Sequence, residues 1–208
     1  MRYLFRCLLL IFAISVLFTA TCHTRLPGAG TAQYFPNLSR PSWLPTSNDT
    51  VAASTSPLAL HYSPAENLEH LDIDLIEQSR DHLDIAMYAF TDQAVAQAIV
   101  DVAHRGIPVR IYRDRQQYEE EQARNPYIAQ LFAKTKNISI RVKGSRELMH
   151  LKAWSNGAML RDGSANWSPS GLKRQDNSAL FTTDAGDIRA FEGNFNQMWS
   201  RRDNYVVQ

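Results

Sequence analysis

Two short segments of this sequence bring together residues whose types and spacing could do chemistry. His150 and Lys152 stand two positions apart in an apolar stretch, so in a β-strand both side chains leave the same face. A few residues later, Gly163 permits close approach of the backbone, and Ser164 and Asn166 present short polar side chains on one side of a turn. An imidazole, a fixed cation and two neutral donors suit the binding of a tetrahedral oxyanion such as phosphate.

Nothing in the sequence suggests that a metal ion assists this site. No compact set of carboxylates, histidines or cysteines has metal-ligand spacing, so we predict neither a metal nor a cofactor. Each residue also has a structural interpretation when taken alone, because a histidine in a strand packs, and serine or asparagine beside glycine forms a turn. The ordered combination is therefore what predicts a phosphate site.

The composition indicates a globular domain around these residues. The chain has 208 residues, 44% of them apolar, with 22 Lys and Arg against 21 Asp and Glu. This balance excludes a disordered acidic or basic protein. The two cysteines exclude a disulfide scaffold and a structural zinc site, and the length suits one domain preceded by a tail.

The start of the chain has a different character from the rest. Arg2 and Arg6 precede the apolar run Cys7–Phe18, which leads into small residues, the pattern of a secretory signal peptide. An uncleaved N-terminal anchor is the alternative, and either predicts an exported protein, periplasmic or secreted. The expected organisation is a signal peptide or anchor at 1–22, a linker or arm rich in Pro, Gly, Ser and Thr at 23–57, and a folded domain at 58–208.

Alternating strand and helix patterns must position the candidate residues. Leu83–Phe90 and Ile107–Tyr112 are apolar runs typical of buried strands, and the segment between them has the apolar period of a helix, capped by Thr91 and ended by Gly106. Ser63-Pro64-Ala65-Glu66 predicts a capping box that opens an earlier helix. This alternation indicates parallel strands with right-handed crossovers.

The candidate site itself falls in a predicted hairpin. Met149–Trp154 and Ala158–Arg161 have extended patterns on either side of Asn156-Gly157, a strong signal for a two-residue turn. Other strands are expected at Leu58–Tyr62, Ile138–Val142 and Ala179–Thr182. The helix opened by the capping box carries Leu68, Leu71, Ile73, Leu75 and Ile76, and other helices are expected at Ile128–Phe132 and Asp187–Ser200. The expected fold is an α/β sandwich with a mixed, largely parallel central sheet flanked by helices.

The two motifs together resemble the HxK(x)4D…GSxN signature of the phospholipase D superfamily. The resemblance is colinear over about residues 58–200 and includes the segments Asp84–Thr91, Arg105–Arg110 and Ser168–Asn177. It is greatest for the single-motif members, which include Nuc-type bacterial endonucleases and the mitochondrial cardiolipin hydrolase. The resemblance implies a phospholipase D-like catalytic domain at 58–208 that hydrolyses phosphodiesters without a metal.

The resemblance also implies a role for each matched residue. His150 is the nucleophile that forms a phosphohistidine, while Lys152, Ser164 and Asn166 hold the non-bridging oxygens. Asp176 stands where family members carry a carboxylate that orients the nucleophilic imidazole, although it also fits an ordinary loop aspartate. A second histidine is needed as the acid, and a homodimer with a shared active site on its twofold axis supplies His150 of the other chain.

One motif position departs from the family. The aspartate expected five residues after Lys152 is Gly157, and Asn156 stands one place earlier. In the family this aspartate supports the site, so Asn156 is the candidate for that supporting role, and we expect activity to be reduced. The alternative is a catalytically weakened or inactive phosphate-binding envelope protein.

The residues that precede the motif bear on the substrate. Arg141, Lys143 and Arg146 predict a local basic strip that leads to His150 and suits a polyanion. The nearly balanced total charge gives no broad basic face for a long duplex, and no amphipathic basic helix marks a membrane-surface enzyme. Nucleic acid is the favoured substrate, and phospholipid is the second.

Overall fold

The structure is a computed structural model that describes residues 58–207. The expected signal peptide or anchor at 1–22 and the expected arm at 23–57 lie outside these residues. Within the described part of the chain, no helix is long and apolar enough to cross a membrane.

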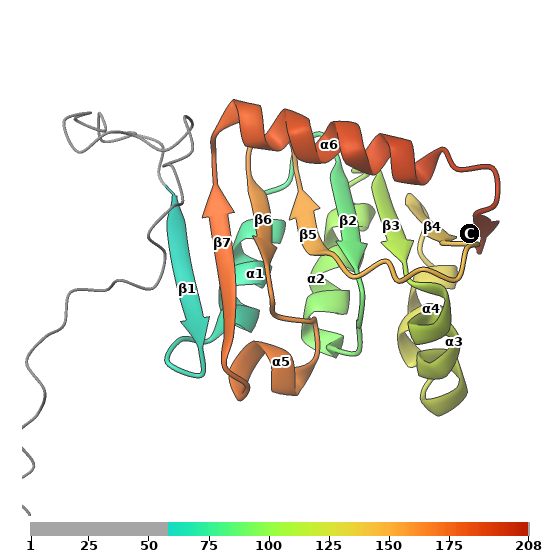
Figure 1. Ribbon diagram of the computed structural model, residues 1–208, viewed down its shortest axis with the longest axis horizontal. Coiled ribbons are helices and arrows are strands. Elements are labelled where there is room, and N and C mark those ends of the chain that lie inside the picture. Colours follow the sequence, from blue (N-terminus) through green and yellow to red (C-terminus); the bar gives the residue numbers. More distant parts are fainter. Residues whose placement is uncertain (1–57, 208) are drawn as a thin grey trace, which may run out of the picture. The chain divides into compact units, whose positions relative to one another are not determined.

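An eight-stranded mixed sheet forms the centre of the domain, with strand order β1-β7-β6-β5-β2-β3-β4-β8 (Figure 1). Its strands are β1 Ala59–Ser63, β2 Leu83–Met87, β3 Val109–Arg113, β4 Ile138–Val142, β5 Lys152–Ser155, β6 Leu160–Gly163, β7 Asn177–Thr182 and β8 Tyr205–Val206. Parallel pairing is confined to β2, β3 and β4, and every other pair is antiparallel. The prediction of a mixed sheet is confirmed, with less parallel pairing than the sequence indicated.

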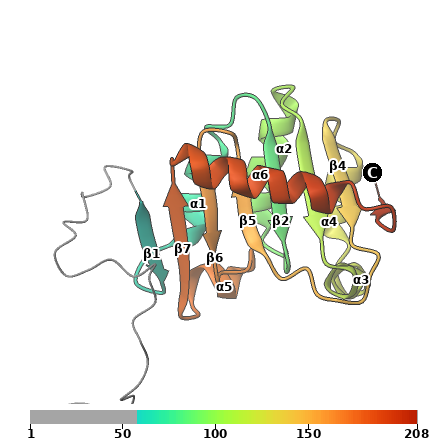
Figure 2. The same ribbon diagram turned by 45° about the horizontal axis from the view of Figure 1, so that its top comes forward.

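Helices cover both faces of this sheet. They are α1 Leu68–Ile76, α2 Gln93–His104, α3 Arg115–Arg124, α4 Tyr127–Ala133, α5 Pro169–Lys173 and α6 Ala185–Trp199. Helix α6 crosses one face, whereas α1 and α2 lie on the other (Figures 1 and 2). The sequence patterns did not predict α3, α5 or β8.

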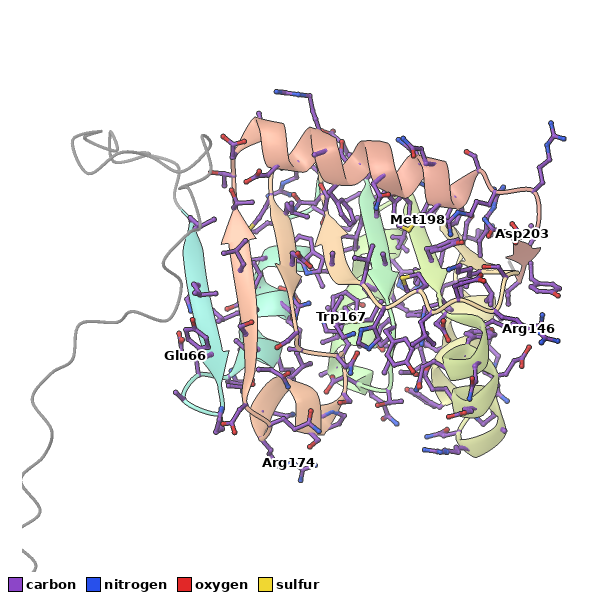
Figure 3. The ribbon with its side chains drawn as sticks, in the orientation of Figure 1. Glu66, Arg146, Trp167, Arg174, Met198 and Asp203 are labelled. Carbon is purple, nitrogen blue, oxygen red and sulfur yellow. The ribbon has the colours of Figure 1, made fainter. Side chains whose placement is uncertain are left out.

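The core has one layer on each side of the sheet. The larger apolar cluster lies between the sheet and α1 and α2, and it includes Ile85 and Trp154. A smaller cluster under α6 joins Ala86 to Phe195 and Met198 (Figure 3). Because Ile85 and Ala86 are neighbours that point to opposite faces, β2 is buried on both sides, as predicted for this segment.

Two helix starts differ from the sequence prediction. Helix α1 begins after Asn67, whose side-chain oxygen accepts hydrogen bonds from the amides of the first turn. The predicted capping box at Ser63–Glu66 is wrong, because the Glu66 carboxylate binds the His61 ring and the Tyr62 amide instead of a helix end. Helix α2 is capped by Asp92, one residue later than predicted, since a carboxylate accepts the first-turn amides more effectively.

The hairpin between β5 and β6 is confirmed, but its turn is shifted by one residue. The Asn156 amide donates to the Met159 carbonyl at 3.2 Å, so the central residues are Gly157 and Ala158 and not Asn156-Gly157. Gly157 has φ +81°, which suits glycine at the first central position of a II′ turn. The Asn156 side-chain oxygen accepts from the Ala158 and Met159 amides at 3.1 and 2.9 Å, and this fixes the turn.

Candidate active site

Lys152 is the first residue of β5, and His150 lies in the loop just before it. The Lys152 side chain is only 5% exposed, and its Nζ donates to the His150 carbonyl at 2.8 Å. His150 is exposed, and its ring packs edge-on against Tyr88, with 4.6 Å between centroids. The Lys152 ammonium also lies over the Tyr88 ring, 5.0 Å from its centroid. Tyr88 therefore contacts both motif residues.

The GSxN segment meets the same end of β2. Asn166 accepts a hydrogen bond from the Ala89 amide at 3.4 Å, and Trp167 forms a β-bridge with Phe90. Ala89 directly follows Tyr88, the residue that contacts His150. The structure thus brings His150, Lys152 and Asn166 to one short segment of backbone, Tyr88–Ala89.

Ser164 lies on the β7 side of this segment. Its hydroxyl donates to the Asn177 side-chain oxygen at 2.9 Å and accepts from the Ser178 amide at 2.9 Å. Ser164 and Asn177 line an open depression together with Tyr62 and Asp176. Asn177 was not among the predicted site residues, because its contact with Ser164 depends on the pairing of β6 with β7.

Asp176 is exposed at the rim of the same depression. Within residues 58–207 it makes no hydrogen bond or ion pair, with His150 or with any other residue. Its role in orienting the imidazole stays a prediction.

Asn156 lies at the opposite end of β5 from His150. There it supports the turn, and its side-chain nitrogen donates to the Leu75 carbonyl of α1 at 3.5 Å. The support role predicted for Asn156 is thus exerted on the hairpin and not on the phosphate site.

The environment of Lys152 lowers its affinity for a proton. The pKa of Lys152 is lowered to about 8, mainly by burial and next by the positive charge of Arg161, while the negative charge of Asp162 acts in the opposite direction. A lysine ordinarily titrates near pH 10.4, so this ammonium is poised to lose its charge in mildly alkaline solution. Any phosphate held by Lys152 is bound best below that pH.

A buried ion pair lies behind the two motifs. Asp72 of α1 and Arg161 of β6 are both fully buried, with 3.5 Å between the Arg161 Nε and Asp72 Oδ1 atoms. The two Asp72 oxygens accept hydrogen bonds from the indoles of Trp154 and Trp167 at 2.8 and 2.9 Å. Arg161 also donates to the carbonyls of Lys152 and Ala165, and so it joins the HxK strand to the GSxN segment.

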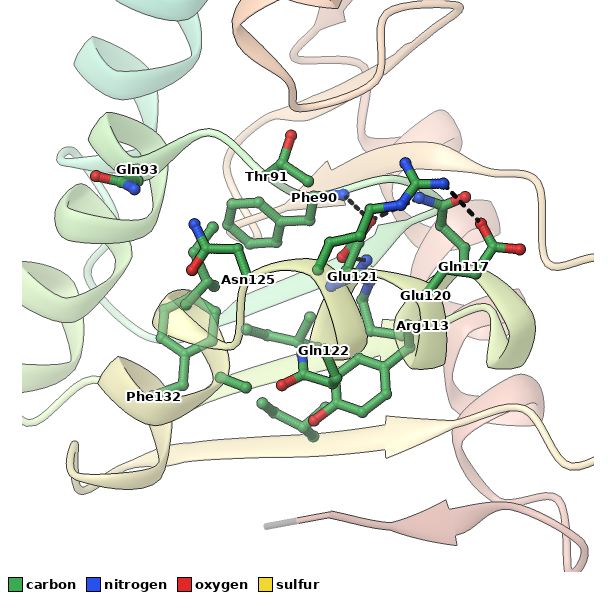
Figure 4. A pocket seen from close by; sticks show the side chains of 16 residues that line it. Phe90, Thr91, Gln93, Arg113, Gln117, Glu120, Glu121, Gln122, Asn125 and Phe132 are labelled. Atoms are coloured by element: carbon green, nitrogen blue, oxygen red, sulfur yellow. Dashed lines mark hydrogen bonds and ion pairs between the residues drawn. The ribbon is translucent and has the colours of Figure 1, made fainter.

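A second buried ion pair fixes the segment that carries Tyr88. Arg113 donates to the carbonyls of Met87 and Tyr88 and pairs with Glu121 of α3 at 2.6 Å. Glu121 in turn accepts from the Phe90 amide at 2.9 Å (Figure 4). These groups border a small cavity of about 100 Å³ between α3, α4 and the sheet. Because Arg113 and Glu121 neutralise each other, neither of them offers an unpaired charge to a ligand in this cavity.

The basic strip predicted before His150 is not formed as expected. Arg141 donates to the Trp199 carbonyl and stacks on its indole, 4.7 Å from the centroid. Lys143 is buried and donates to the Leu148 carbonyl. Arg146 remains exposed in the loop after β4 (Figure 3). The prediction is wrong for Arg141 and Lys143, because Arg141 packs on Trp199 of α6 and Lys143 is buried against the loop before His150.

Residues 58–207 contain no group of three or more His, Cys, Asp or Glu side chains that could hold a metal ion. The exposed imidazole of His150, with the Lys152 ammonium beside Tyr88 and the Asn166 side chain at Ala89, is an arrangement that can do nucleophilic chemistry.

A family model described as "Cardiolipin synthase, PLD-like domain" matches residues 73–199, more than half of the chain. The chain belongs to the phospholipase D-like family. The resemblance inferred from the motifs is thereby confirmed. The matched range contains both halves of the candidate site.

Curated relatives and solved structures agree with this family. The chain is 24% identical over 130 residues to a mitochondrial cardiolipin hydrolase of Xenopus tropicalis, covering 62% of this chain and 60% of the relative. It is 27% identical over 149 residues to that of Danio rerio, covering 71% of this chain and 61% of the relative. The chain thus spans about 60% of the length of these relatives.

Two solved structures share the fold of this phospholipase D-like domain. NucT from Helicobacter pylori superposes with a TM-score of 0.63 at 24% identity, covering 73% of this chain and 99% of that one. Nuc from Salmonella typhimurium, a phospholipase D family member, gives the same TM-score at 18% identity, covering 74% and 99%. An open mixed sheet flanked by helices is common to all three, which confirms the predicted fold class.

Proposed function

We propose that the protein is a phosphodiester hydrolase of the phospholipase D type. The observation that carries the proposal is the meeting of His150, Lys152 and Asn166 at Tyr88 and Ala89, in a chain of the phospholipase D-like family. Exposure of the His150 ring leaves it accessible to a substrate, while burial of Lys152 fixes a cation beside it.

The proposed reaction has two steps. The His150 imidazole attacks the phosphorus, a P–N bond forms, and the P–O bond to the leaving alcohol breaks as a second histidine donates its proton to that oxygen. Water then attacks the phosphohistidine, gives its proton to the second histidine, and releases the phosphate monoester and free His150. Lys152, Ser164 and Asn166 hold the non-bridging oxygens as negative charge builds up.

The second histidine is proposed to come from another copy of the chain. In a homodimer with the candidate site on its twofold axis, His150 of each chain faces His150 of the other. If wild-type and His150→Ala chains are mixed equally and assort freely, about a quarter of the dimers hold both histidines, and activity falls to that level. Independent sites would leave about half of the activity, and that outcome would exclude the shared site.

The substrate is proposed to be a nucleic acid or a phospholipid, and the protein is proposed to act outside the cytoplasm. Inward turning of Arg141 and Lys143 removes part of the charge that favoured nucleic acid. The names of the curated relatives refer to a phospholipid, whereas the relatives of known structure include Nuc proteins. Both substrate classes therefore have to be tested together.

The deciding experiment incubates the purified protein with plasmid DNA, with RNA and with vesicles that contain labelled cardiolipin, each with and without EDTA. We expect one substrate class to be cleaved, and cleavage to survive EDTA because Lys152 supplies the positive charge. Activity that disappears in EDTA and returns with magnesium would contradict the proposed mechanism. Phosphate binding without cleavage of any of the substrates would instead favour the phosphate-binding alternative suggested by Gly157.

A further inference from the structure

The buried ion pair of Asp72 and Arg161 is not needed to stabilise the fold, since apolar residues could fill the same space. Arg161 stands opposite Trp154 in the pairing of β6 with β5, on the face that Lys152 also uses. Its guanidinium is fully buried, and its Nε makes no hydrogen bond. Burial of an incompletely bonded cation is unfavourable, and a pair of apolar residues often replaces a buried ion pair at no loss of stability.

The hydrogen bonds of Arg161 converge on the candidate site. One guanidinium nitrogen donates to the carbonyl of Lys152 and another to the carbonyl of Ala165 at 3.1 Å. Lys152 belongs to the HxK motif, and Ala165 lies between Ser164 and Asn166. A single side chain thus links the backbone of the two motifs that have to face the same phosphate.

We propose that Arg161 is a positioning residue for Lys152, which it holds against the GSxN segment while keeping a second positive charge behind the ammonium. Asp72 holds Arg161 in place through their ion pair, and the two indoles that donate to Asp72 keep that carboxylate fixed. This inference rests on the proposed function only for its effect on catalysis. The effect on Lys152 itself is independent of any substrate.

The charged and titratable groups around Lys152 define what Arg161 can change. Tyr88 lies at the end of β2, His150 precedes β5, Arg161 and Asp162 come from β6, and Asp72 of α1 is paired with Arg161. Burial is the largest cause of the lowered pKa of Lys152, and the Arg161 charge is the next. Loss of the Arg161 charge therefore raises that pKa, because the ammonium no longer faces a like charge.

The consequence is that activity should fall in alkaline solution, at a pH that the surroundings of Lys152 determine. With a pKa of about 8, Lys152 becomes neutral as the pH rises past that value, and the phosphate loses its fixed cation. Without the Arg161 charge, the same loss occurs at higher pH. Arg161 would therefore hold the enzyme's operating range to neutral and acidic conditions.

The test measures the titration of Lys152 directly, in the full-length protein without substrate. The sequence contains five lysines, so ¹³Cε-lysine NMR resolves a small number of signals, and Lys152→Arg identifies the one of interest. We expect the Lys152 midpoint to rise by about one pH unit in Arg161→Met and to stay unchanged in Arg161→Lys, which keeps the charge. Arg174→Met is the matched control, because Arg174 is exposed and points away from the domain beyond α5 (Figure 3).

Arg161→Met leaves Asp72 buried without its cation, so the double variant Asp72→Asn/Arg161→Met provides a second test if the single variant unfolds. The Lys152 midpoint should rise in the double variant as well. A midpoint that stays at the wild-type value in a folded protein lacking Arg161 would overturn the proposal. In activity profiles, the alkaline limb should shift with the NMR midpoint; failure to cleave any phosphodiester would refute the proposed function and leave the NMR result standing.

Discussion

Asp114 connects the start of α3 to the loop that carries His150, and its removal has a predictable cost. The carboxylate is 3% exposed, and one oxygen accepts from the Gln117 amide at 3.0 Å, capping α3. The other oxygen accepts from the Met149 amide at 2.9 Å, immediately before His150. Loss of an N-cap costs about 1 kcal/mol, and loss of a hydrogen bond to a buried charge costs about 1.5–3 kcal/mol.

Asp114→Ala is therefore expected to lower the free energy of unfolding by about 2.5–4 kcal/mol, which corresponds to roughly 10 °C in Tm for a domain of this size. Asp114→Asn keeps the capping oxygen but turns an NH2 group toward the Met149 amide, so it should lose only the second contribution. Asn67→Ala, which removes the cap of α1 and touches nothing near His150, should cost about 1 kcal/mol.

Urea unfolding followed by circular dichroism measures these differences, and turnover of a phosphodiester measures their effect on the site. We expect kcat to fall in both Asp114 variants, because the backbone before His150 is no longer held, and to remain unchanged in Asn67→Ala. If Asp114→Asn is as stable as the wild type, the hydrogen bond from the Met149 amide does not contribute to stability, and the reasoning is refuted.

Two further predictions concern the motif position and the pH dependence of stability. Gly157→Asp, which restores the family's aspartate, should lower stability by at least about 1–2 kcal/mol, since φ is +81° and a Cβ there would lie 2.9 Å from His82 Cε1. Asn156→Asp should fold normally and leave activity equal or higher, and an unstable Asn156→Asp variant with a stable Gly157→Asp variant would contradict both expectations. Burial and the neighbouring Glu69 raise the pKa of Asp92 to about 6, above its unfolded value near 4, so its contribution to stability falls as the pH rises from about 4 to 6. Asp92→Asn keeps the cap of α2 and should be more stable than the wild type by about 1–2 kcal/mol at pH 7 but not at pH 4, as measured by urea unfolding at both pH values.

The sequence was most informative where a local pattern and the tertiary structure agree. The buried strand β2 and the hairpin of β5 and β6 both follow from local residue patterns. Asn67 was missed as the cap of α1 because Ser63 to Glu66 match the capping-box pattern in sequence. In the structure Glu66 pairs with His61 across a turn, and the helix begins only after Asn67.

The contacts that complete the candidate site depend on sheet order, which periodicity does not contain. Tyr88 reaches His150 because β2 pairs with β5, although many residues and several elements separate them along the chain. Asp72 and Arg161 carry charges that an amphipathic pattern assigns to the surface, and only the packing of α1 on the sheet buries them. Such contacts could be predicted only after the topology was known.

The most direct test of the central claim compares phosphodiester hydrolysis by the wild type, His150→Ala and His104→Ala, using bis(p-nitrophenyl) phosphate as a probe that does not presuppose the natural substrate. His104 is exposed at the end of α2, so its variant controls for the loss of an imidazole elsewhere on the domain. With all three proteins shown to be folded, His150→Ala should lose at least about 1,000-fold in kcat/KM, and His104→Ala should match the wild type. Undiminished hydrolysis by His150→Ala would contradict the assignment of His150 as the nucleophile.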